Sequence, residues 1–535
     1  MRKRLTAVLA ALAACGVILG CGSSGGSSGT AEEAKPAKLG ESSAPEPTGD
    51  PVSGGTLVMD RMIEPESFDP IGTTDNGSLF AQVQVFDRLV ELLPDSLEPQ
   101  PGLAESWEVS PDGRTYTFNL RPGVQFSNGD PVTVDDVLFS LERFRSPADP
   151  YSFMVTAITS IESQSQNQIV VKLKTPLPSL LYALSLPAAS IVPKDVYEEL
   201  GSAKFGSEPV GSGAFVVRSF SRGQKLELER NPNYWREAEP YLDEVVMRYV
   251  PDDNARILDV TSGRADVAEN IPYSQVAQVD GKPGVYVEVT PITGIEHIYL
   301  NNTTDELSDV RVRQALAYAT PVQQLIESVY FGNVVPANNV IAPGAYIDDS
   351  VPSVPFDVEK AKELMEQAGY SDGFGLTLLI PGTDSTAKQL ATILQSSWAD
   401  IGVDLEIQQV ADGNAVYAEI TKGAYDAAYF GVDTADVPVE DELYPFLYYR
   451  AENGNNTGFP SSAKLEKLVE EAVTSTDEAE RHELFSQVQT MGMEQLPFVP
   501  VAFATARVGV RDEVQNYQTT VSSWPRLEQV WLSGG

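Results

Sequence analysis

Few side chains in this sequence could carry out metal or nucleophilic chemistry. The 535 residues include two cysteines, Cys15 and Cys21, and two histidines, His297 and His482. Both cysteines lie within the first 21 residues, so the rest of the chain can form neither a disulfide nor a thiolate metal site. Because the sequence has no cluster of His and Cys, zinc sites, blue-copper sites and Cys-His nucleophiles are excluded. We therefore expect no metal and no cofactor.

The histidines and the carboxylates also favour a chain without catalysis. His482 lies in a polar helical stretch, residues 477–483, which predicts a surface position. His297 alternates with apolar neighbours in residues 295–300, as a strand residue would, so a structural role is favoured over a ligand role. The 76 Asp and Glu residues include no local motif that singles out a catalytic pair. An exported hydrolase, such as a glycosidase, is therefore a remote alternative.

One glycine-rich stretch, residues 211–213, could in principle hold a phosphate. Gly211, Ser212 and Gly213 stand close enough to form a loop of backbone amides, but no lysine follows at the spacing of a P-loop. The sequence therefore predicts a tight turn at this position.

Length and charge indicate a large globular protein with more than one core. The chain is 42% hydrophobic, which is enough to build two or more cores. Its formal net charge is −39, and phosphate binding needs a concentrated basic face, so nucleic acid is excluded as a partner. The acidity itself is typical of a solvated surface and identifies no substrate.

The N-terminus has the pattern of an export signal. Basic residues 2–4 precede an apolar run, residues 5–20, that is short for a membrane-spanning helix, so we interpret residues 1–20 as a signal peptide. Residues 18–21 resemble a lipobox, in which Cys21 would carry the lipid. Cys15 fits the pattern locally, but cleavage there would leave the apolar residues 16–19 exposed, so Cys21 is the preferred site. Residues 21–53 are rich in Gly, Ser and Pro and predict a flexible, lipid-anchored tether.

From residue 54 onward, short alternating strands interleave with amphipathic helices, which indicates a mixed α/β protein. The clearest stretch begins at Asp357, which can cap a helix that Gly369 would end. A strand is expected at 376–380, a helix at about 390–401 and a second strand at 403–407. This order is a βαβ crossover and predicts a parallel sheet.

Several motifs along the chain resemble the bacterial extracellular solute-binding proteins of family 5, the oligopeptide, dipeptide and nickel class. The motifs are Glu-Pro-Glu-Ser-Phe-Asp-Pro at 64–70, Val-Phe-Asp-Arg-Leu-Val at 85–90, residues 103–113, residues 116–129, residues 209–215, Arg-Asn-Pro-Asn-Tyr-Trp at 230–235 and residues 309–319. The chain departs from the pattern at Thr320 and Pro321, where many relatives continue with Asp-Arg. The departure concerns where that helix ends.

The resemblance implies an α/β, two-lobe periplasmic-binding-protein fold of type II, in the large class that has an extra subdomain in the first lobe. Lobe I is expected at 54–90, 206–290 and 505–535, and the inserted subdomain at 91–205. Lobe II is expected at 291–504. A ligand that contacts both lobes only when they are closed would shift the population to the closed state, which an importer could recognise.

The resemblance also implies the ligand contacts. In the family an aspartate after a Trp-x-Ala-like tripeptide anchors the ligand amine. Residues 429–433 correspond to that stretch, with Phe430 in place of the Trp and Val432 in place of the Ala, so Asp433 is the candidate anchor and Phe430 a candidate wall. Asp436 is a second choice for the amine. Thr74, Asp75 and Asn76 fall where relatives contact the ligand backbone, and Phe503 is a further candidate wall. For each residue the plain alternative is a turn, a cap or a core position.

The implied cargo is a peptide, with an oligosaccharide or another small solute such as a nickel chelate as alternatives. The implied partners are an ABC permease with its ATPase subunits and, through the lipid, the outer face of the cytoplasmic membrane. We expect a monomer. The length of the peptide and the identity of the permease do not follow from the sequence.

Overall fold

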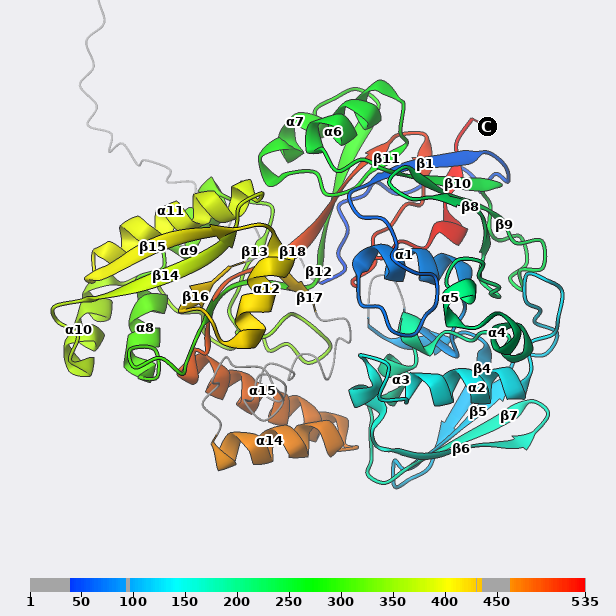
Figure 1. Cartoon of the computed structure of the whole chain (residues 1–535), viewed down its shortest axis with the longest axis horizontal. Helices are drawn as coiled ribbons and strands as arrows, with labels where there is room; N and C mark the ends of the chain where they lie inside the picture. The colour runs from blue at the N-terminus through cyan, green and yellow to red at the C-terminus, as the bar shows by residue number, and fades with distance from the viewer. Residues whose placement is uncertain (1–38, 93–96, 430, 435–461, 535) are drawn as a thin grey trace, which may run out of the picture. The chain divides into compact units, whose positions relative to one another are not determined.

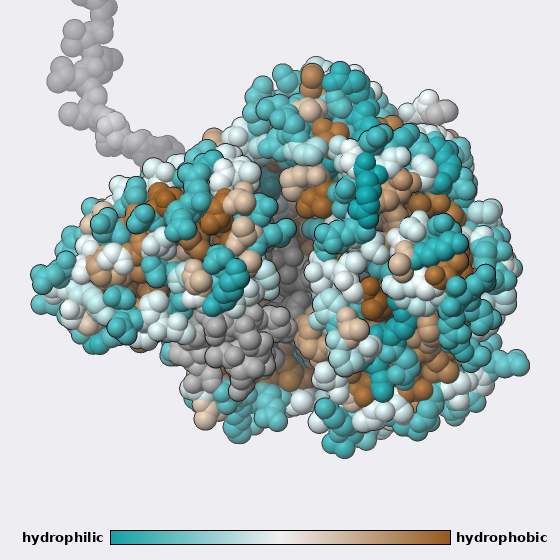
Figure 2. Space-filling model, in the orientation of Figure 1, coloured by the Kyte–Doolittle hydropathy of each residue, from teal (hydrophilic) through white to brown (hydrophobic). Residues whose placement is uncertain are grey.

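The computed structural model describes residues 39–92, 97–429, 431–434 and 462–534. Within these ranges no helix has the length and apolarity needed to cross a membrane. On the face shown in Figure 2, hydrophilic residues predominate and apolar residues form small separate patches, in keeping with the acidic composition.

One large mixed sheet runs through the described chain (Figure 1). Two outer groups of strands flank the central pair β12 and β18; we call the group β11, β1, β10, β9, β8 the β1 half, and the group β15, β14, β16, β17 the β14 half. The strands in sheet order are β15 (Val403–Val410), β14 (Phe374–Pro381), β16 (Ala427–Ala428), β12 (Val285–Leu300), β18 (Phe498–Arg511), β11 (Val267–Ala268), β1 (Thr56–Arg61), β10 (Glu244–Tyr249), β9 (Lys225–Arg230) and β8 (Phe215–Ser221), with β13 (Val335–Pro336) on β18 and β17 (Val432–Thr434) on β12.

The central strands β12 and β18 connect the two halves. They pair antiparallel from Val285 opposite Arg511 to Tyr299 opposite Phe498, and the register is interrupted between Pro291 and Ile295. A second irregularity follows between Glu296 and His297. Such irregularities bend a strand pair locally, so the connection between the halves bends at this point of β12.

Helices cover the β14 half, and the local pattern of the sequence accounts for them. They are α8 (Val310–Tyr318), α9 (Val322–Ser328), α10 (Val358–Ala368), α11 (Ser385–Ala399), α12 (Gly413–Lys422), α14 (Ala463–Thr474) and α15 (Glu478–Gln495). The cap expected at Asp357 is confirmed, since its carboxylate accepts from the Lys360 amide, and Gly369 ends α10 with a φ of 91°. β14 and β15 are parallel, so the predicted βαβ crossover is also confirmed.

The unusual Thr320-Pro321 pair has a clear structural reason. Pro321 cannot continue a helix, so α8 ends at Tyr318 and α9 begins at Val322. The Thr320 hydroxyl accepts a hydrogen bond from Trp398 Nε1 at 3.1 Å, which ties this junction to α11. The departure from the family pattern therefore marks a boundary between two helices in one core.

The β1 half has its own helices and core. Helix α1 (Asn76–Val85) packs on β8, and α6 (Asp253–Ser262) packs on β11 and β18, with α7 (Val276–Asp280) nearby on β12. The core beneath α1 joins β1, β8, β9 and β10 to the C-terminal residues 508–530, and a smaller cluster lies beneath α6 and α7. The described chain thus returns to the β1 half at its end. A small pair, β19 (Val514–Gln515) and β20 (Trp531–Leu532), lies in this last segment.

A second, antiparallel sheet has a separate core between residues 89 and 191. Its helix α2 begins with a capping box, in which Thr133 and Asp136 bond each other's backbone amides. Its strands in order are β4 (Ala104–Val109), β5 (Thr115–Leu120), β7 (Gln168–Leu173) and β6 (Ile158–Ser165), and nearby elements are β2 (Val90–Leu92), β3 (Pro99–Pro101), α2 (Val134–Phe144), α3 (Leu180–Ala183), α4 (Lys194–Leu200) and α5 (Ser202–Phe205). Short 3-10 turns occupy Ser152–Val155, Pro187–Ala189, Tyr273–Gln275 and Leu527–Gln529.

The segment 40–48, which falls within the range expected to be a flexible tether, is bound to β12. The Gly40 amide donates to the Pro291 carbonyl at 3.0 Å. The Ser43 amide donates to the Val289 carbonyl, and the Val289 amide donates back to Ser43 Oγ at 2.7 Å. Residues 40–48 therefore differ from the expectation, because their backbone finds partners on β12 that local composition does not indicate.

Candidate ligand-binding site

The loop before α1 places three of the predicted site residues. Asp75 is the N-cap of α1, and its Oδ1 accepts from the Ser78 amide at 2.7 Å, while its Oδ2 is buried with no hydrogen-bond partner among the described residues. Asn76 Oδ1 accepts from Trp524 Nε1 at 3.1 Å. Thr74 is exposed. The helix cap and the C-terminal segment therefore fix this region. The Thr74 side chain and the Oδ2 atom of Asp75 have no role in fixing it and could contact a ligand.

Two further predicted residues, Asp433 and Phe503, lie beside β12 at its register interruption. In strand β17 the backbone of Asp433 lies opposite Ile295 of β12. On the other edge of β12, Phe503 of β18 also lies opposite Ile295 and is 7% exposed in a small apolar cluster with Ala337 and Ala342. Phe430 and Asp436 lie outside the described residues, and for Asp433 the structure describes the backbone.

A cavity of about 160 Å³, here called the β12 cavity, joins the first residue of α1 to the central strands. It brings Asn76 to Ile292 of β12 and to Thr505 and Arg507 of β18. Arg507 is held in place by carbonyl oxygens at 271 and 505 and by the face of Tyr273, 3.6 Å away. The residues that line the β12 cavity are Arg61, Met62, Ile63, Asn76, Glu269, Asn270, Ile292, Thr505, Ala506, Arg507, Val508, Tyr517, Thr519 and Ser523.

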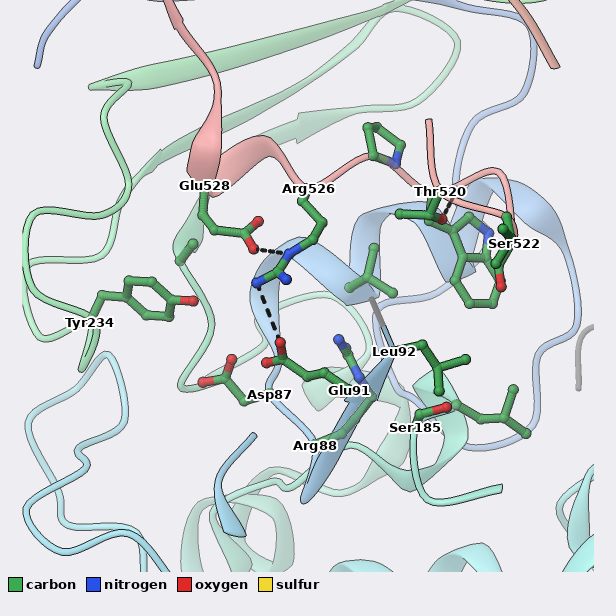
Figure 3. Close-up of a pocket in the computed structure, with 16 residues that line it drawn as sticks. Asp87, Arg88, Glu91, Leu92, Ser185, Tyr234, Thr520, Ser522, Arg526 and Glu528 are labelled. Atoms are coloured by element: carbon green, nitrogen blue, oxygen red, sulfur yellow. Dashed lines mark hydrogen bonds and ion pairs between the residues drawn. The ribbon is translucent and has the colours of Figure 1, made fainter. Parts of the chain in front are cut away.

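A second cavity of about 90 Å³, here called the Arg88 cavity, lies in the β1 half beside the end of α1 (Figure 3). Trp524, which donates to Asn76, lines it on one side. Its other lining residues are Val83, Asp87, Arg88, Glu91, Leu92, Ser185, Leu186, Ala214, Tyr234, Thr520, Val521, Ser522, Pro525, Arg526 and Glu528. The Asn76–Trp524 pair therefore connects the two cavities.

The carboxylates of the Arg88 cavity are mostly paired. Arg526 Nε donates to Glu528 at 2.6 Å, and Arg236 donates to Glu91 at 2.6 Å. Burial alone would raise the pKa of Glu91, but Arg236 and Arg526 outweigh it and hold that pKa below its usual range. Burial raises the pKa of Asp87 to about 7, with the charge of Glu91 adding to the rise.

A buried carboxyl group that the sequence analysis missed lies on β12. Glu296 is 2% exposed and accepts hydrogen bonds from the hydroxyls of Tyr273 at 3.1 Å, Tyr330 at 3.2 Å and Tyr429. Burial raises the pKa of Glu296. The Glu296 carboxyl group therefore fixes the side chain of Tyr429, which lies three residues before β17 in the sequence. The signal was a single carboxylate residue within the mostly apolar residues 292–300.

The two histidines lie where the sequence predicted. His297 is in β12, 3% exposed, and stacks on Phe498 at 4.7 Å, and burial lowers its pKa to about 3. His482 is on the exposed side of α15, 3.7 Å from Glu478. Among the described residues no group of three or more His, Cys, Asp or Glu side chains could hold a metal.

The glycines at 211–213 serve packing. A Cβ at Gly211 would lie 2.0 Å from the Val85 carbonyl oxygen, and one at Gly213 would lie 2.5 Å from the Val85 carbonyl carbon. The predicted tight turn therefore packs closely against the end of α1, a contact that the sequence alone did not indicate.

Other functional candidates escaped the sequence analysis altogether. Trp524, Arg88, Arg526 and Arg507 reach their cavities from the two ends of the sequence. Arg88 lies inside the Val-Phe-Asp-Arg-Leu-Val motif and could have been noticed there, whereas Trp524 has no local signal.

Known proteins resemble this chain over most of its length. The family model for bacterial extracellular solute-binding proteins, family 5 Middle, matches residues 98–455. A heme-binding protein A of Haemophilus influenzae is 29% identical over 498 residues, which cover 87% of this chain and 90% of that protein. A dipeptide-binding protein of Escherichia coli is 29% identical over 501 residues, which cover 87% and 92%.

Solved structures agree. The periplasmic binding protein DppA of Helicobacter pylori, solved with the peptide STSA, has a TM-score of 0.79 and 29% identity, covering 90% of this chain and 98% of that one. NikA of Brucella suis, solved with Fe(III)-EDTA, has a TM-score of 0.81 at 24% identity, covering 90% and 100%, and supports the fold alone. The predicted α/β fold of the type II periplasmic binding proteins is confirmed. The chain belongs to the bacterial extracellular solute-binding proteins of family 5.

Proposed function

We propose that this chain is the substrate-binding component of an ABC importer and that it captures peptides at the β12 cavity. Among its relatives, the Escherichia coli protein is named for dipeptides and the Helicobacter pylori structure holds a peptide. Family membership also supports a binding protein rather than an enzyme.

The observation that carries the proposal is the meeting of distant segments at one stretch of β12. Asn76 reaches Ile292 across the β12 cavity, and β17 and β18 flank Ile295 with Asp433 and Phe503. A ligand at this stretch would contact the loop before α1 on one side and β17 on the other. Contacts of this kind exist together only in a closed arrangement and so favour it.

We propose Asp433 as the anchor of the peptide α-ammonium and residues 74–76 as contacts for its backbone. A charge-assisted hydrogen bond of this type is worth about 1.5–3 kcal/mol, which corresponds to roughly tenfold or more in affinity. Phe430 and Phe503 are proposed as apolar walls, with Asp436 as the alternative anchor. The β12 cavity supports this assignment through its polar groups, Asn76 and Thr505, which suit peptide amides.

The N-terminal features complete the proposal. Cleavage after residue 20 would leave Cys21 as the lipid-bearing residue, with Cys15 as the alternative, and would hold the protein at the outer face of the cytoplasmic membrane. We propose residues 54–90, 206–290 and 505–535 as lobe I, 91–205 as its inserted subdomain and 291–504 as lobe II, acting as a monomer.

A thermal-shift screen of the full chain, freed of carried ligand by dialysis from denaturant, tests the function. The set includes di- to octapeptides, oligosaccharides, nickel chelates and hemin. A ligand at 100 times its Kd stabilises the native state by about 2.7 kcal/mol. We expect stabilisation by peptides, lost when their amino groups are acetylated. Stabilisation by sugars, hemin or chelates alone would reject peptides as cargo, and turnover of any compound would reject the binding-protein assignment.

A further inference from the structure

Arg88 differs from the neighbouring arginines because no carboxylate of the described residues lies within ion-pair distance of it. Its Nη1 donates to the Phe86 carbonyl at 3.1 Å, while its Nε is buried with no hydrogen-bond partner within the described part of the chain. By contrast, Arg526 and Arg236 are paired with Glu528 and Glu91. In Figure 3 the guanidinium of Arg88 points into the cavity. The Arg88 guanidinium therefore keeps a buried donor, Nε, to which no acceptor of the described residues is bonded.

Hydroxyl groups of the C-terminal segment line the same cavity as Arg88. Thr520 Oγ1 accepts from the Trp524 amide at 3.2 Å, so its own hydrogen remains free to donate. The Ser522 side chain also lines the cavity, from the same wall as Thr520 (Figure 3). A carboxylate has about four acceptor sites, so it could accept from the guanidinium on one wall and from hydroxyls on the other.

The acidic residues around the cavity have hydrogen-bond partners other than Arg88. Glu91 and Glu528 are ion-paired, and Asp87 accepts from Trp235 Nε1 at 3.0 Å. The buried Nε of Arg88 still lacks an acceptor, which a carboxylate of a ligand could supply. A cationic ligand would meet carboxylates that already have partners.

The C-terminal segment connects this cavity with the β12 cavity. Thr519 and Ser523 line the β12 cavity, whereas Thr520 and Ser522 line the Arg88 cavity. One short segment therefore separates the two sites, and Asn76 lies at the junction through its bond with Trp524. An extended ligand anchored at the β12 cavity could reach the Arg88 cavity with its other end.

We propose that the Arg88 cavity is a subsite for a carboxylate of the bound ligand, held by Arg88 with Thr520 and Ser522. The proposal rests on the peptide-binding function above and adds where the acidic end of the peptide lies. The carboxylate comes either from the C-terminus of the peptide or from an acidic side chain, and the same chemistry recognises both.

Isothermal titration of the full chain with alanine peptides of two to five residues tests this subsite. Each length is compared as the free acid and as the C-terminal amide, and a third arm uses amidated peptides that contain one glutamate. We expect the free acid or the glutamate-containing amide to bind at least about tenfold more tightly than the plain amide. In Arg88→Gln this preference should fall to less than about twofold.

Two further variants keep the test decisive. Ser522→Ala breaks no hydrogen bond within the described residues and should reduce the preference even if Arg88→Gln does not fold. The control Arg222→Gln removes an exposed arginine that also donates to a backbone carbonyl, and it should leave the preference unchanged.

The outcomes separate this inference from the function on which it rests. Equal binding of acids and amides by the wild type, or a preference that survives both Arg88→Gln and Ser522→Ala, would overturn the subsite while peptide binding stands. If the wild type binds none of the peptides, the proposed function fails and the subsite fails with it.

Discussion

Replacing Asp87 by Asn should make the stability of the protein less dependent on pH. Asp87 is 5% exposed, and burial raises its pKa to about 7 from the usual 3.8. The folded protein therefore holds a proton that the unfolded chain releases. The stabilisation from this proton is complete below about pH 3.8 and is lost as the pH rises through 7.

The size of this pH dependence follows from the rise in the pKa of Asp87. Each pH unit between the two pKa values changes the free energy of unfolding by about 1.4 kcal/mol, so the wild type should lose about 2–3 kcal/mol relative to Asp87→Asn between pH 5 and pH 8. The asparagine stays neutral throughout, and its Oδ1 can still accept from Trp235 Nε1. Neighbouring charges such as Glu91, Arg236 and Arg88 are common to both proteins.

Scanning calorimetry of the two proteins at pH 5, 6, 7 and 8 measures this difference. For a cooperative unit of 150–250 residues, 1 kcal/mol shifts the Tm by roughly 2–4 °C. The Tm of Asp87→Asn should therefore rise relative to the wild type by about 4–12 °C over this range. Asp404→Asn, at an exposed position of edge strand β15, serves as the control. A difference that is constant or shrinks with rising pH would refute the reasoning.

Three other changes have expected outcomes. Asp433→Asn should weaken peptide binding at least about tenfold, measured by calorimetry, without lowering the Tm. The control Asp404→Asn should change neither the affinity nor the Tm. An unchanged affinity in Asp433→Asn would reject Asp433 as the anchor. Gly211→Ala should destabilise the protein by more than about 3 kcal/mol because its Cβ would overlap the end of α1. The control Gly375→Ala should not destabilise it in this way, because the nearest neighbour of the new Cβ would be 3.8 Å away. Similar Tm values for the two variants would contradict this account. Removing residues 1–48 should lower the Tm below that of a chain lacking only 1–38, because the bonds of segment 40–48 to β12 are lost, and equal Tm values would show that this segment adds no stability.

Local structure could be predicted where it depends on residues that are close together in the sequence. The cap at Asp357, the end of α10 at Gly369 and the parallel pair β14 and β15 depend on a few neighbouring residues, and each was predicted. The surface position of His482 and the strand position of His297 follow from the same kind of pattern.

The cavities were not predictable, because their walls come from separate parts of the chain. Arg88 and Trp524 are more than 400 residues apart in sequence, and only the return of the chain to the β1 half brings them to one cavity. The carboxyl group of Glu296 likewise needs tyrosines from three distant segments. Nor did composition reveal that segment 40–48 binds β12, since its partners there are backbone groups and the Glu288 carboxylate, all far away in the sequence. For Asp433, family resemblance supplied a prediction that periodicity alone could not give.

The paired strands β12 and β18 have a consequence for how much freedom the two halves possess. Hydrogen-bonded strands resist sliding, because a slip of one residue would break the register and turn every side chain to the opposite face. A two-stranded ribbon can still bend and twist, most easily where its pairing is interrupted, between Pro291 and Ile295. The relative motion of the two halves is thereby limited to bending and twisting of this ribbon. A ligand bound next to this interruption acts close to the axis of the motion, where a small local displacement produces a large movement at the far ends of the halves.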